Sequence, residues 1–367
     1  MRKKTGNYTD LVSAAATSMR PTRRHLLQLG GSAMVAGLAM PFVPRRAAAQ
    51  DTLYVNSWGG VWEEAAYKNL FNPFTEKTGI EVRTVSPVSY AKLAAQAQTG
   101  TYDFDVATVS GWQVPQAQPA EILEPIDRDV IDTGALQDDA VFMDSIASHA
   151  PSINLVYDKR VFEPGSMTSW ADFWDLERFP GLRGMRRGAA DCLIFALLAD
   201  GVPVSDLYPP DADRAFASLD RIKNNVPVWW TEGPQALQLI QDGEVPAIPL
   251  WNSISSVAIE RGVPLEIVWN QAKINPVYWV VSKGTPRAKI AWEFINFAIQ
   301  PENLAGFCID GRYGPMHQAA FEYVPDEAAK LMPTYPANYE VAFEEDSEAI
   351  GSQLTDLTRR FNDWLAT

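Results

Sequence analysis

The chain has 367 residues, a formal net charge of −14, two cysteines and three histidines. Its first fifty residues hold eight Lys and Arg and one Asp, so that residues 51–367 carry a charge of −21. So large an acidic excess excludes general nucleic-acid binding, which requires a basic face. Residues 51–367 are numerous enough for two domains.

The first fifty residues are predicted to be an export signal that takes no part in the fold. The segment Thr22–Leu27 contains the arginine pair of a twin-arginine signal. Gly30–Val43 is apolar but too short and too rich in glycine for a good membrane span. Ala47–Ala49 supplies small residues before a cleavage site near Ala49. We therefore expect a periplasmic protein exported by the twin-arginine pathway; a cytoplasmic protein with a basic tail is the alternative.

The chain after this leader begins with the pattern of a strand, a tight turn, a helix and a second strand. Leu53–Val55 is a short apolar run, and Gly59 and Gly60 allow a tight turn. Apolar residues then recur at helical spacing as far as Gly79, which suits a helix C-cap. In folds built from such units, ligands bind beyond the carboxyl ends of the strands. Trp58 stands at such an end, where it either faces a ligand or packs on its own helix.

Strands and helices alternate through the rest of the chain, which predicts an α/β fold with largely parallel sheets. No flexible linker divides the chain, so two lobes joined by crossover strands fit its length better than separate domains. The predicted strands are 104–109, 153–157, 182–185, 226–230, 246–250, 265–269 and 277–281. The predicted helices are 89–98, 135–148, one that opens at Thr168 or Ser169, 192–199, 209–223, 231–241, 253–260, 286–299 and 349–365.

Sequence motifs for catalysis are missing. The chain has no GxSxG, HExxH or Walker motif and no GxGxxG after a strand. His149 lies near Ser148, but neighbours on one predicted helix do not form a catalytic triad. Cys192 and Cys308 lie in apolar segments, which favours two buried free thiols over a disulfide, and no metal or cofactor pattern occurs. An exported enzyme and a binding protein linked to a sensor remain the alternatives from other classes.

Four tryptophans stand at or just after predicted strand ends: Trp58, Trp112, Trp230 and Trp251. Four aromatic side chains at loop mouths would line one cleft, where indole faces hold cations at about 0.5–2 kcal/mol per contact. The alternative is that some of the twelve tryptophans fall at strand ends by chance and belong to the core.

Five segments make the chain similar to the periplasmic solute-binding proteins of ABC transporters, specifically the spermidine/putrescine-binding group. They are YVNSWGGVWEEA, TSWADFWDLERFPGLRGMRRG, LIFALLADGVP, VWWTEGPQALQLIQDGEV and YWVVSKGTP, and the resemblance covers nearly all of residues 51–367. It implies two α/β lobes that close on a ligand in the cleft between them, delivery to a membrane permease, and neither catalysis nor a cofactor. We place lobe 1 at 51–153 plus 275–318 and lobe 2 at 154–274 plus 319–367, and we expect a monomer.

The resemblance also implies a set of ligand-binding positions. The first aromatic clamp falls on Trp58, with Gly59 and Gly60 beside it. The further positions are Ser110, Trp112, Asp191, Trp251, Asn252 and Tyr313, with Thr231 a weaker match and Asn275 at a position where the chain departs from the group.

Two acidic residues typical of polyamine binders have no counterpart in this sequence. One precedes the buried strand near Tyr278, where this chain has Asn275, Pro276 and Val277. The other follows the first Trp, where Gly59 and Gly60 stand. A diamine needs a carboxylate near each ammonium, because burying an unpaired charge is costly.

With Asp191 as the one matched acid, the nature of the ligand stays open. It is a polyamine-like solute, a smaller or quaternary amine, or an amino-acid-like compound. Arg186 or Arg187 would hold the carboxylate of an amino-acid-like ligand, unless both are plain surface arginines. Asp191 would pair with a ligand ammonium, or would only cap its helix.

Overall fold

The computed structural model describes residues 52–131 and 140–367. The predicted twin-arginine signal, its cleavage site and the first part of the predicted helix 135–148 lie outside these residues. Among the helices of the described ranges, none combines the length and the apolar character needed to cross a membrane.

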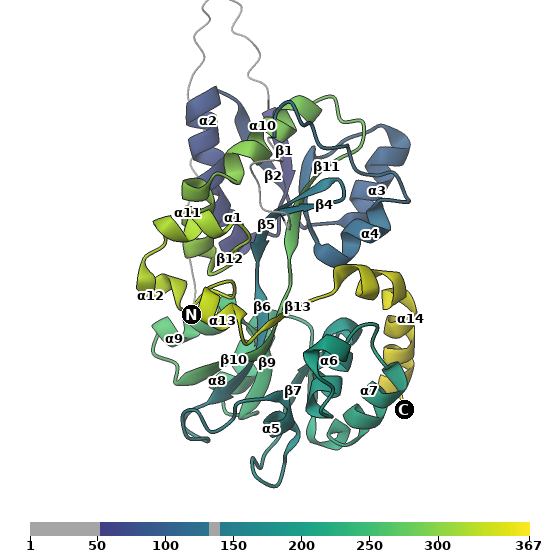
Figure 1. Cartoon of the computed structure of the whole chain (residues 1–367), viewed down its shortest axis with the longest axis vertical. Helices are drawn as coiled ribbons and strands as arrows, with labels where there is room; N and C mark the ends of the chain where they lie inside the picture. Colours follow the sequence, from purple (N-terminus) through teal and green to yellow (C-terminus); the bar gives the residue numbers. More distant parts are fainter. Residues whose placement is uncertain (1–51, 132–139) are drawn as a thin grey trace, which may run out of the picture. The chain divides into compact units, whose positions relative to one another are not determined.

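The first sheet has the strand order β12–β5–β11–β3–β1–β2, with β4 paired to β5 (Figure 1). Strands β2, β1 and β3 run parallel to one another. Strand β11 is antiparallel to both of its neighbours, β3 and β5. The strands are β1 (Thr52–Asn56), β2 (Glu81–Val85), β3 (Val106–Ser110), β4 (Val141–Phe142), β5 (Ser145–Ala150), β11 (Val277–Val281) and β12 (Gly314–Pro315). Strand β11 has the bounds that its continuous apolar run predicts.

Helices pack on both faces of this sheet (Figure 1). They are α1 (Gly60–Ala66), the π-helical turn η1 (Tyr67–Phe71), α2 (Asn72–Thr78), α3 (Tyr90–Thr99), η2 (Gly111–Gln113), α4 (Val114–Ala117), α10 (Ala288–Ala298), α11 (Pro301–Gly311), η7 (Gln318–Tyr323), α12 (Asp326–Ala329) and α13 (Pro336–Tyr339). Gly79 ends α2 in the left-handed conformation, with φ 76°, so the predicted C-cap is confirmed.

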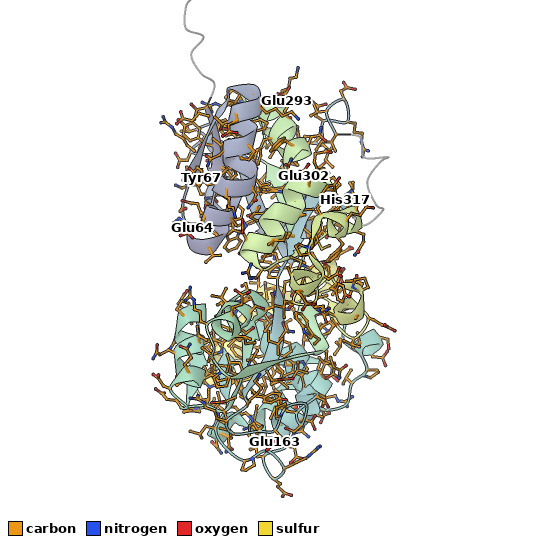
Figure 2. The ribbon with its side chains drawn as sticks, turned by 90° about the vertical axis from the view of Figure 1, so that its left-hand side faces the viewer. Glu64, Tyr67, Glu163, Glu293, Glu302 and His317 are labelled. Carbon is orange, nitrogen blue, oxygen red and sulfur yellow. The ribbon has the colours of Figure 1, made fainter. Side chains whose placement is uncertain are left out.

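The run from α1 to α2 lies alongside α10 and α11, as the positions of Glu64 and Tyr67 beside Glu293 and Glu302 show (Figure 2). Aromatic rings fill the space between these helices and the sheet. Trp62 meets Phe307 edge to face at 5.7 Å between ring centroids, and other buried rings of α2 and α10 extend this cluster. The helical periodicity of the sequence is therefore explained by one continuous apolar interface.

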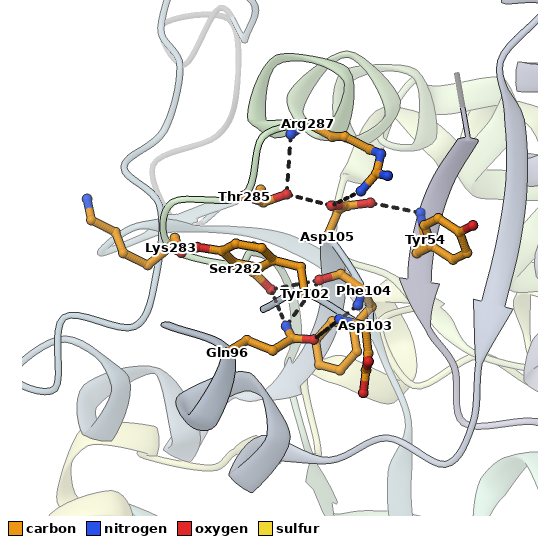
Figure 3. Close-up of polar contacts among 10 residues, drawn as sticks. All are labelled: Tyr54, Gln96, Tyr102, Asp103, Phe104, Asp105, Ser282, Lys283, Thr285 and Arg287. Carbon is orange, nitrogen blue, oxygen red and sulfur yellow. Dashed lines mark hydrogen bonds and ion pairs between the residues drawn. The ribbon is translucent and has the colours of Figure 1, made fainter. Parts of the chain in front are cut away.

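A polar network closes the sheet at the amino end of β3 (Figure 3). The fully buried Asp105 accepts hydrogen bonds from the Tyr54 backbone N–H at 3.0 Å and the Thr285 hydroxyl at 2.5 Å, and it pairs with Arg287 at 3.3 Å. Beside it, the Gln96 side chain of α3 bonds the backbone at the start of β3. These bonds tie β1, β3, α3 and the end of β11 together.

The second sheet has the order β13–β10–β6–β9, and a separate parallel pair, β7–β8, accompanies it. The strands are β6 (Ser152–Asp158), β7 (Gly184–Arg186), β8 (Val228–Trp230), β9 (Ala247–Trp251), β10 (Leu265–Ile274) and β13 (Phe343–Glu344). Strand β6 is antiparallel to both β9 and β10. The prediction of largely parallel sheets is therefore wrong for this sheet.

The physical reason lies in how the chain passes between the sheets. Strand β5 continues almost directly into β6, and β10 continues almost directly into β11. Because no helix intervenes at either passage, β6 and β10 enter the second sheet as long strands of opposite direction instead of as strand–helix–strand units. These passages are the crossover strands that the chain length suggested.

The helices of the second sheet are α5 (Trp170–Trp174), α6 (Ala189–Ala199), η5 (Val204–Asp206), α7 (Ala212–Asp220), η6 (Lys223–Asn225), α8 (Gly233–Gln241), α9 (Asn252–Glu260) and α14 (Ser347–Leu365). Trp170 stacks on Phe195 at 3.9 Å between ring centroids, and α5 lies in the core. Cys192 and Cys308 are buried and free, so the preference for two thiols over a disulfide is confirmed.

The predicted helix 135–148 is wrong over its described part, where β4 and β5 occur. Every residue of β5 is buried, because the strand lies between β11 and its other neighbours in the sheet. A strand that is covered on both faces has no alternation of polar and apolar residues, so its sequence resembles that of a buried helix. His149 lies on this strand and not on a helix.

Candidate functional site

A cavity of about 570 Å³ opens between the two sheets, at the carboxyl ends of strands of both. Its size is in the range of small-molecule binding sites. Its walls come from the ends of β3, β5, β7 and β9, from the β10–β11 passage, and from α14. The charged and aromatic lining residues are Trp58, Trp62, Trp112, His149, Arg186, Arg187, Asp191, Trp251, Lys273, Tyr313, Glu345 and Phe361.

Seven of the eleven candidate site residues line this cavity. They are Trp58, Ser110, Trp112, Asp191, Trp251, Asn275 and Tyr313. Gly59, Gly60, Thr231 and Asn252 do not line it. The structure thus brings together positions from both sheets that lie more than 250 residues apart in the sequence.

Trp58 faces the cavity and does not pack on its own helix. The residue is 47% exposed, and its indole Nε1 donates a hydrogen bond to the Thr108 hydroxyl at 2.7 Å. Gly59 and Gly60 have φ of 75° and 53°, conformations that other residues rarely adopt. These glycines turn the chain from β1 into α1 and so aim the indole.

One of the four residues that do not line the cavity, Asn252, supports its walls in another way. Asn252 is fully buried: its side chain accepts from the Ser152 N–H at 2.9 Å and donates to the Arg312 carbonyl at 2.7 Å. It therefore joins the second sheet to the loop that carries Tyr313. Thr231 is exposed and lies away from the cavity.

Trp230 was the fourth tryptophan predicted at a cleft mouth, and that prediction is wrong. Its side chain is 0% exposed and belongs to the core around α8. Sequence could not separate it from Trp58, because both follow an apolar strand and precede small or polar residues. The difference is that Trp230 packs with buried residues of α8, whereas Trp58 is 47% exposed.

A buried network of charges forms one wall of the cavity. The Asp191 carboxylate, 1% exposed, pairs with Arg186 and accepts a hydrogen bond from Lys273 Nζ at 2.7 Å. Lys273 is 0% exposed and also pairs with Glu345, which accepts a hydrogen bond from the Asn275 amide at 3.4 Å. We call these residues, Arg186, Asp191, Lys273, Asn275 and Glu345, the site network.

Ionisation is maintained throughout the site network. Burial opposes the charged form of Asp191, but Lys273 and Arg186 outweigh it and hold the pKa of this carboxyl at about 2. Burial likewise opposes the charged form of Lys273, and Asp191 and Glu345 outweigh it and raise its pKa. Asp191 and Lys273 therefore both stay charged over the physiological range.

The cap interpretation of Asp191 is wrong. Gly188 is the N-cap residue of α6, and no side chain caps that helix. Both oxygens of the Asp191 carboxylate already bond cations of the protein. Sequence analysis missed this pairing, because Lys273 lies in a segment far from Asp191 and belongs to no motif.

His149 is a second residue whose place in the site the sequence did not indicate. Its ring lies tilted against that of Tyr313, at 4.5 Å between ring centroids. Its Nδ1 lies 3.0 Å from the Ser148 hydroxyl. Burial lowers the pKa of His149 to about 3, so the imidazole is neutral at physiological pH.

Arg186, the last residue of β7, and Arg187, the next residue, differ in their partners. Arg186 is half-buried, pairs with Asp191 and lies over the Trp251 ring at 5.4 Å. Arg187 is exposed at the cavity, and its guanidinium has no hydrogen bond or ion pair with any described residue. Three cations and two carboxylates line the cavity, so its lining carries one positive charge in excess.

Two sheets with a cavity between them, aromatic walls and paired internal charges define a protein that encloses a small solute. Residues 69–337 match the family of bacterial extracellular solute-binding proteins. The chain belongs to this family, as the sequence resemblance predicted. Proteins of this kind are the substrate-binding components of ABC transporters and are not enzymes; they bind small ligands and deliver them to a permease.

Two individual relatives are similar to the chain over most of their length. The chain is 35% identical to a gamma-aminobutyric acid-binding protein of Pseudomonas aeruginosa over 345 residues, which are 90% of this chain and 95% of that protein. It is 25% identical to a spermidine/putrescine-binding periplasmic protein of Salmonella typhimurium over 334 residues, 87% of this chain and 91% of that protein.

Solved structures are similar over nearly their whole length. An ABC transporter substrate-binding protein from Bradyrhizobium japonicum has a TM-score of 0.82 and 29% identity, over 86% of this chain and 99% of that one. A GABA receptor structure has a TM-score of 0.80 and 31% identity, over 86% of this chain and 98% of that one. The predicted two-lobe binding-protein fold is confirmed.

Proposed function

We propose that the protein captures a zwitterionic, amino-acid-like solute of the γ-aminobutyrate type and delivers it to an ABC permease. The observation that carries this proposal is the exposed guanidinium of Arg187 in a cavity whose two carboxylates are already paired. A solute that brings its own carboxylate balances the charge of such a cavity, whereas a polyamine adds uncompensated positive charge.

Arg187 is the group that would hold the solute carboxylate. Its planar guanidinium presents parallel N–H donors that suit a bidentate bond to a carboxylate. Arg186 is the less suitable partner, because Asp191 and the Trp251 face already engage it. The alternative of two plain surface arginines is not favoured, since both side chains line the cavity.

The ammonium end would lie against aromatic faces. Trp58, Trp112, Trp251 and Tyr313 border the cavity and offer faces for a cation and for the methylene chain between the two charged ends. Faces of this kind also hold quaternary ammonium groups well. A betaine, which combines such a group with a carboxylate, is therefore a second candidate solute.

The similarity to the Pseudomonas aeruginosa protein supports the same solute class. A protein named for gamma-aminobutyric acid is 35% identical to this chain, and a protein named for spermidine and putrescine is 25% identical. Polyamine binders typically have acidic residues where this chain has Gly59 and Val277. This difference also favours a zwitterionic solute over a polyamine.

Calorimetric titration of the protein without its first fifty residues tests the proposal. We expect γ-aminobutyrate or a betaine to bind and putrescine to bind far more weakly. Replacing Arg187 by Met should cost roughly 2–5 kcal/mol of binding free energy, because the solute carboxylate then loses its partner. The matched control is Arg261→Met, which removes an exposed arginine outside the cavity. Tighter binding of putrescine than of any zwitterion would overturn the proposal.

We also propose a periplasmic location, export by the twin-arginine pathway with cleavage near Ala49, a monomeric state, and the lobes 51–153 plus 275–318 and 154–274 plus 319–367. The arginine pair, the short apolar segment and the small residues of the leader support the export route. Replacing Arg23 and Arg24 by Lys should leave uncleaved precursor inside the cell. Cell fractionation measures this, and normal export of the variant would contradict the route.

A further inference from the structure

The C-terminal helix α14 is more than a tail of the second lobe, because it is anchored at both ends on different parts of the chain. Its first turns press on η2 and α4: a Cβ on Gly351 would lie 2.6 Å from the Trp112 carbonyl, and the Gln116 amide donates to the Gly351 carbonyl at 3.0 Å. Its last turn is held near α7 and η6, where Lys223 Nζ bonds the Trp364 carbonyl at 2.6 Å. The helix thus borders the cavity beside Trp112. It is drawn in yellow at the right of Figure 1.

Four residues of α14 line the cavity: Leu354, Thr358, Phe361 and Asn362. Their spacing of four, seven and eight residues places them on one face of the helix. Leu354 and Phe361 pack against the core of the second lobe, so this is the face that α14 turns toward the protein. Thr355, one turn before Thr358, is exposed and does not line the cavity.

Thr358 and Asn362 flank the apolar stripe of this amphipathic helix and line the cavity. Both residues are exposed. Neither side chain has a hydrogen bond to any described residue. A hydroxyl and an amide thus border the space that the solute would fill, with their bonding capacity unused.

We propose that Thr358 and Asn362 hydrogen-bond the bound solute and that α14 forms a third wall of the site, beside the walls of the two sheets. The inference rests on the proposed function and adds a specificity element to it. A hydroxyl and a primary amide both donate and accept, so they suit either charged end of a zwitterion. The solute would then contact Arg187 and the aromatic side chains of the two lobes, and also Thr358 and Asn362 of α14.

The test is calorimetric titration with γ-aminobutyrate of the wild type, Thr358→Val, Asn362→Leu, Thr358→Ser and the control Thr355→Val. Thr358→Val and Thr355→Val make the same chemical change one turn apart on one helix, and only Thr358 lines the cavity. We expect the Kd to rise roughly 2- to 10-fold for Thr358→Val and for Asn362→Leu, the loss of one hydrogen bond each. Thr355→Val should match the wild type, and Thr358→Ser, which keeps the hydroxyl, should stay close to it. Melting temperatures should not change, because both side chains are exposed.

The outcomes separate the inference from the function on which it rests. If Thr358→Val and Asn362→Leu both bind γ-aminobutyrate with the Kd of the wild type, the inference about α14 is overturned. The proposed function is then unaffected. A wild type that binds no zwitterion overturns the proposed function and this inference with it. If one variant fails to fold, the other, together with Thr358→Ser, still decides the result.

Discussion

Asp105 and Asp191 are two buried carboxylates with similar surroundings and different uses. Asp105 accepts from the Thr285 hydroxyl and the Tyr54 backbone and pairs with Arg287 (Figure 3). Asp191 pairs with Arg186 and Lys273. The bonds of Asp105 join strands and loops within one sheet, at the amino end of β3. Those of Asp191 border the cavity.

The comparison shows that the position of a carboxylate at a cavity does not make it a ligand partner. Asp191 has two cations of its own, so a ligand ammonium would compete with groups that are already desolvated and paired. The group without a partner in the described chain is Arg187, two positions before the start of α6. Charge balance among the lining residues is thus a better guide to the solute than the presence of an acid.

The largest expected effect is on the site network itself. Replacing Lys273 by Met leaves Glu345 without a cation and Asp191 with one, so we expect a loss of about 3–5 kcal/mol in the free energy of unfolding. Urea denaturation measures this loss. The control is Lys283→Met: Lys283 is 43% exposed and pairs with Glu124 at 3.7 Å, so its loss should cost no more than about 1 kcal/mol. Equal effects of the two variants would show that the site network contributes nothing beyond a surface pair.

A pH series tests the contribution of two titratable residues of the cavity, His149 and Asp191, to the free energy of unfolding. The folded protein keeps His149 neutral down to its pKa of about 3, whereas the unfolded chain binds a proton there near pH 6.5. Stability should therefore fall as the pH falls through this window, by up to about 1.4 kcal/mol per pH unit. Below about pH 4, Asp191 adds to the loss, because the unfolded carboxyl takes up a proton that the folded one, with a pKa of about 2, does not.

The variant His149→Gln should flatten the upper part of this curve and leave the part below pH 4 intact. Unfolding midpoints in urea at successive pH values measure both parts. An unchanged slope between pH 6 and pH 4 in the variant would contradict the assignment to His149.

The smallest expected effect concerns Asp105. Asp105→Asn keeps an acceptor for the Tyr54 N–H but weakens the bonds to Thr285 and Arg287, so we expect a loss of about 1–2 kcal/mol in stability and no change in solute affinity. Asp191→Asn should lower both stability and affinity, because Arg186 loses the carboxylate that holds it at the cavity. Titration calorimetry and urea denaturation of the two variants give the contrast; a weakened affinity in Asp105→Asn would remove the distinction between the two regions.

The predicted elements were most accurate where a continuous apolar run or a helical spacing of apolar residues marks the element. Strand β11 has its predicted bounds, helix α8 ends at its predicted residue, and the predicted helix 89–98 is α3, shifted by one residue. The prediction failed at β5, which is buried on both faces and therefore has no strand periodicity. The parallel pairing expected from alternation failed in the second sheet, because the chain enters it along crossover strands without helices.

The sequence by itself determined the class of the protein and predicted seven of the residues that line the cavity. Short ordered segments carry the family resemblance, and local turn chemistry places Trp58, Ser110, Trp112 and Trp251 at strand ends. Only the tertiary structure decided which charges remain available, because Lys273 reaches Asp191 and Glu345 across distances in the chain that no local pattern records. It also decided that Trp230 is covered by α8 and that Thr358 and Asn362 of α14 line the cavity. Pairing and coverage depend on which segments meet in space, and that is the information a single sequence holds least directly.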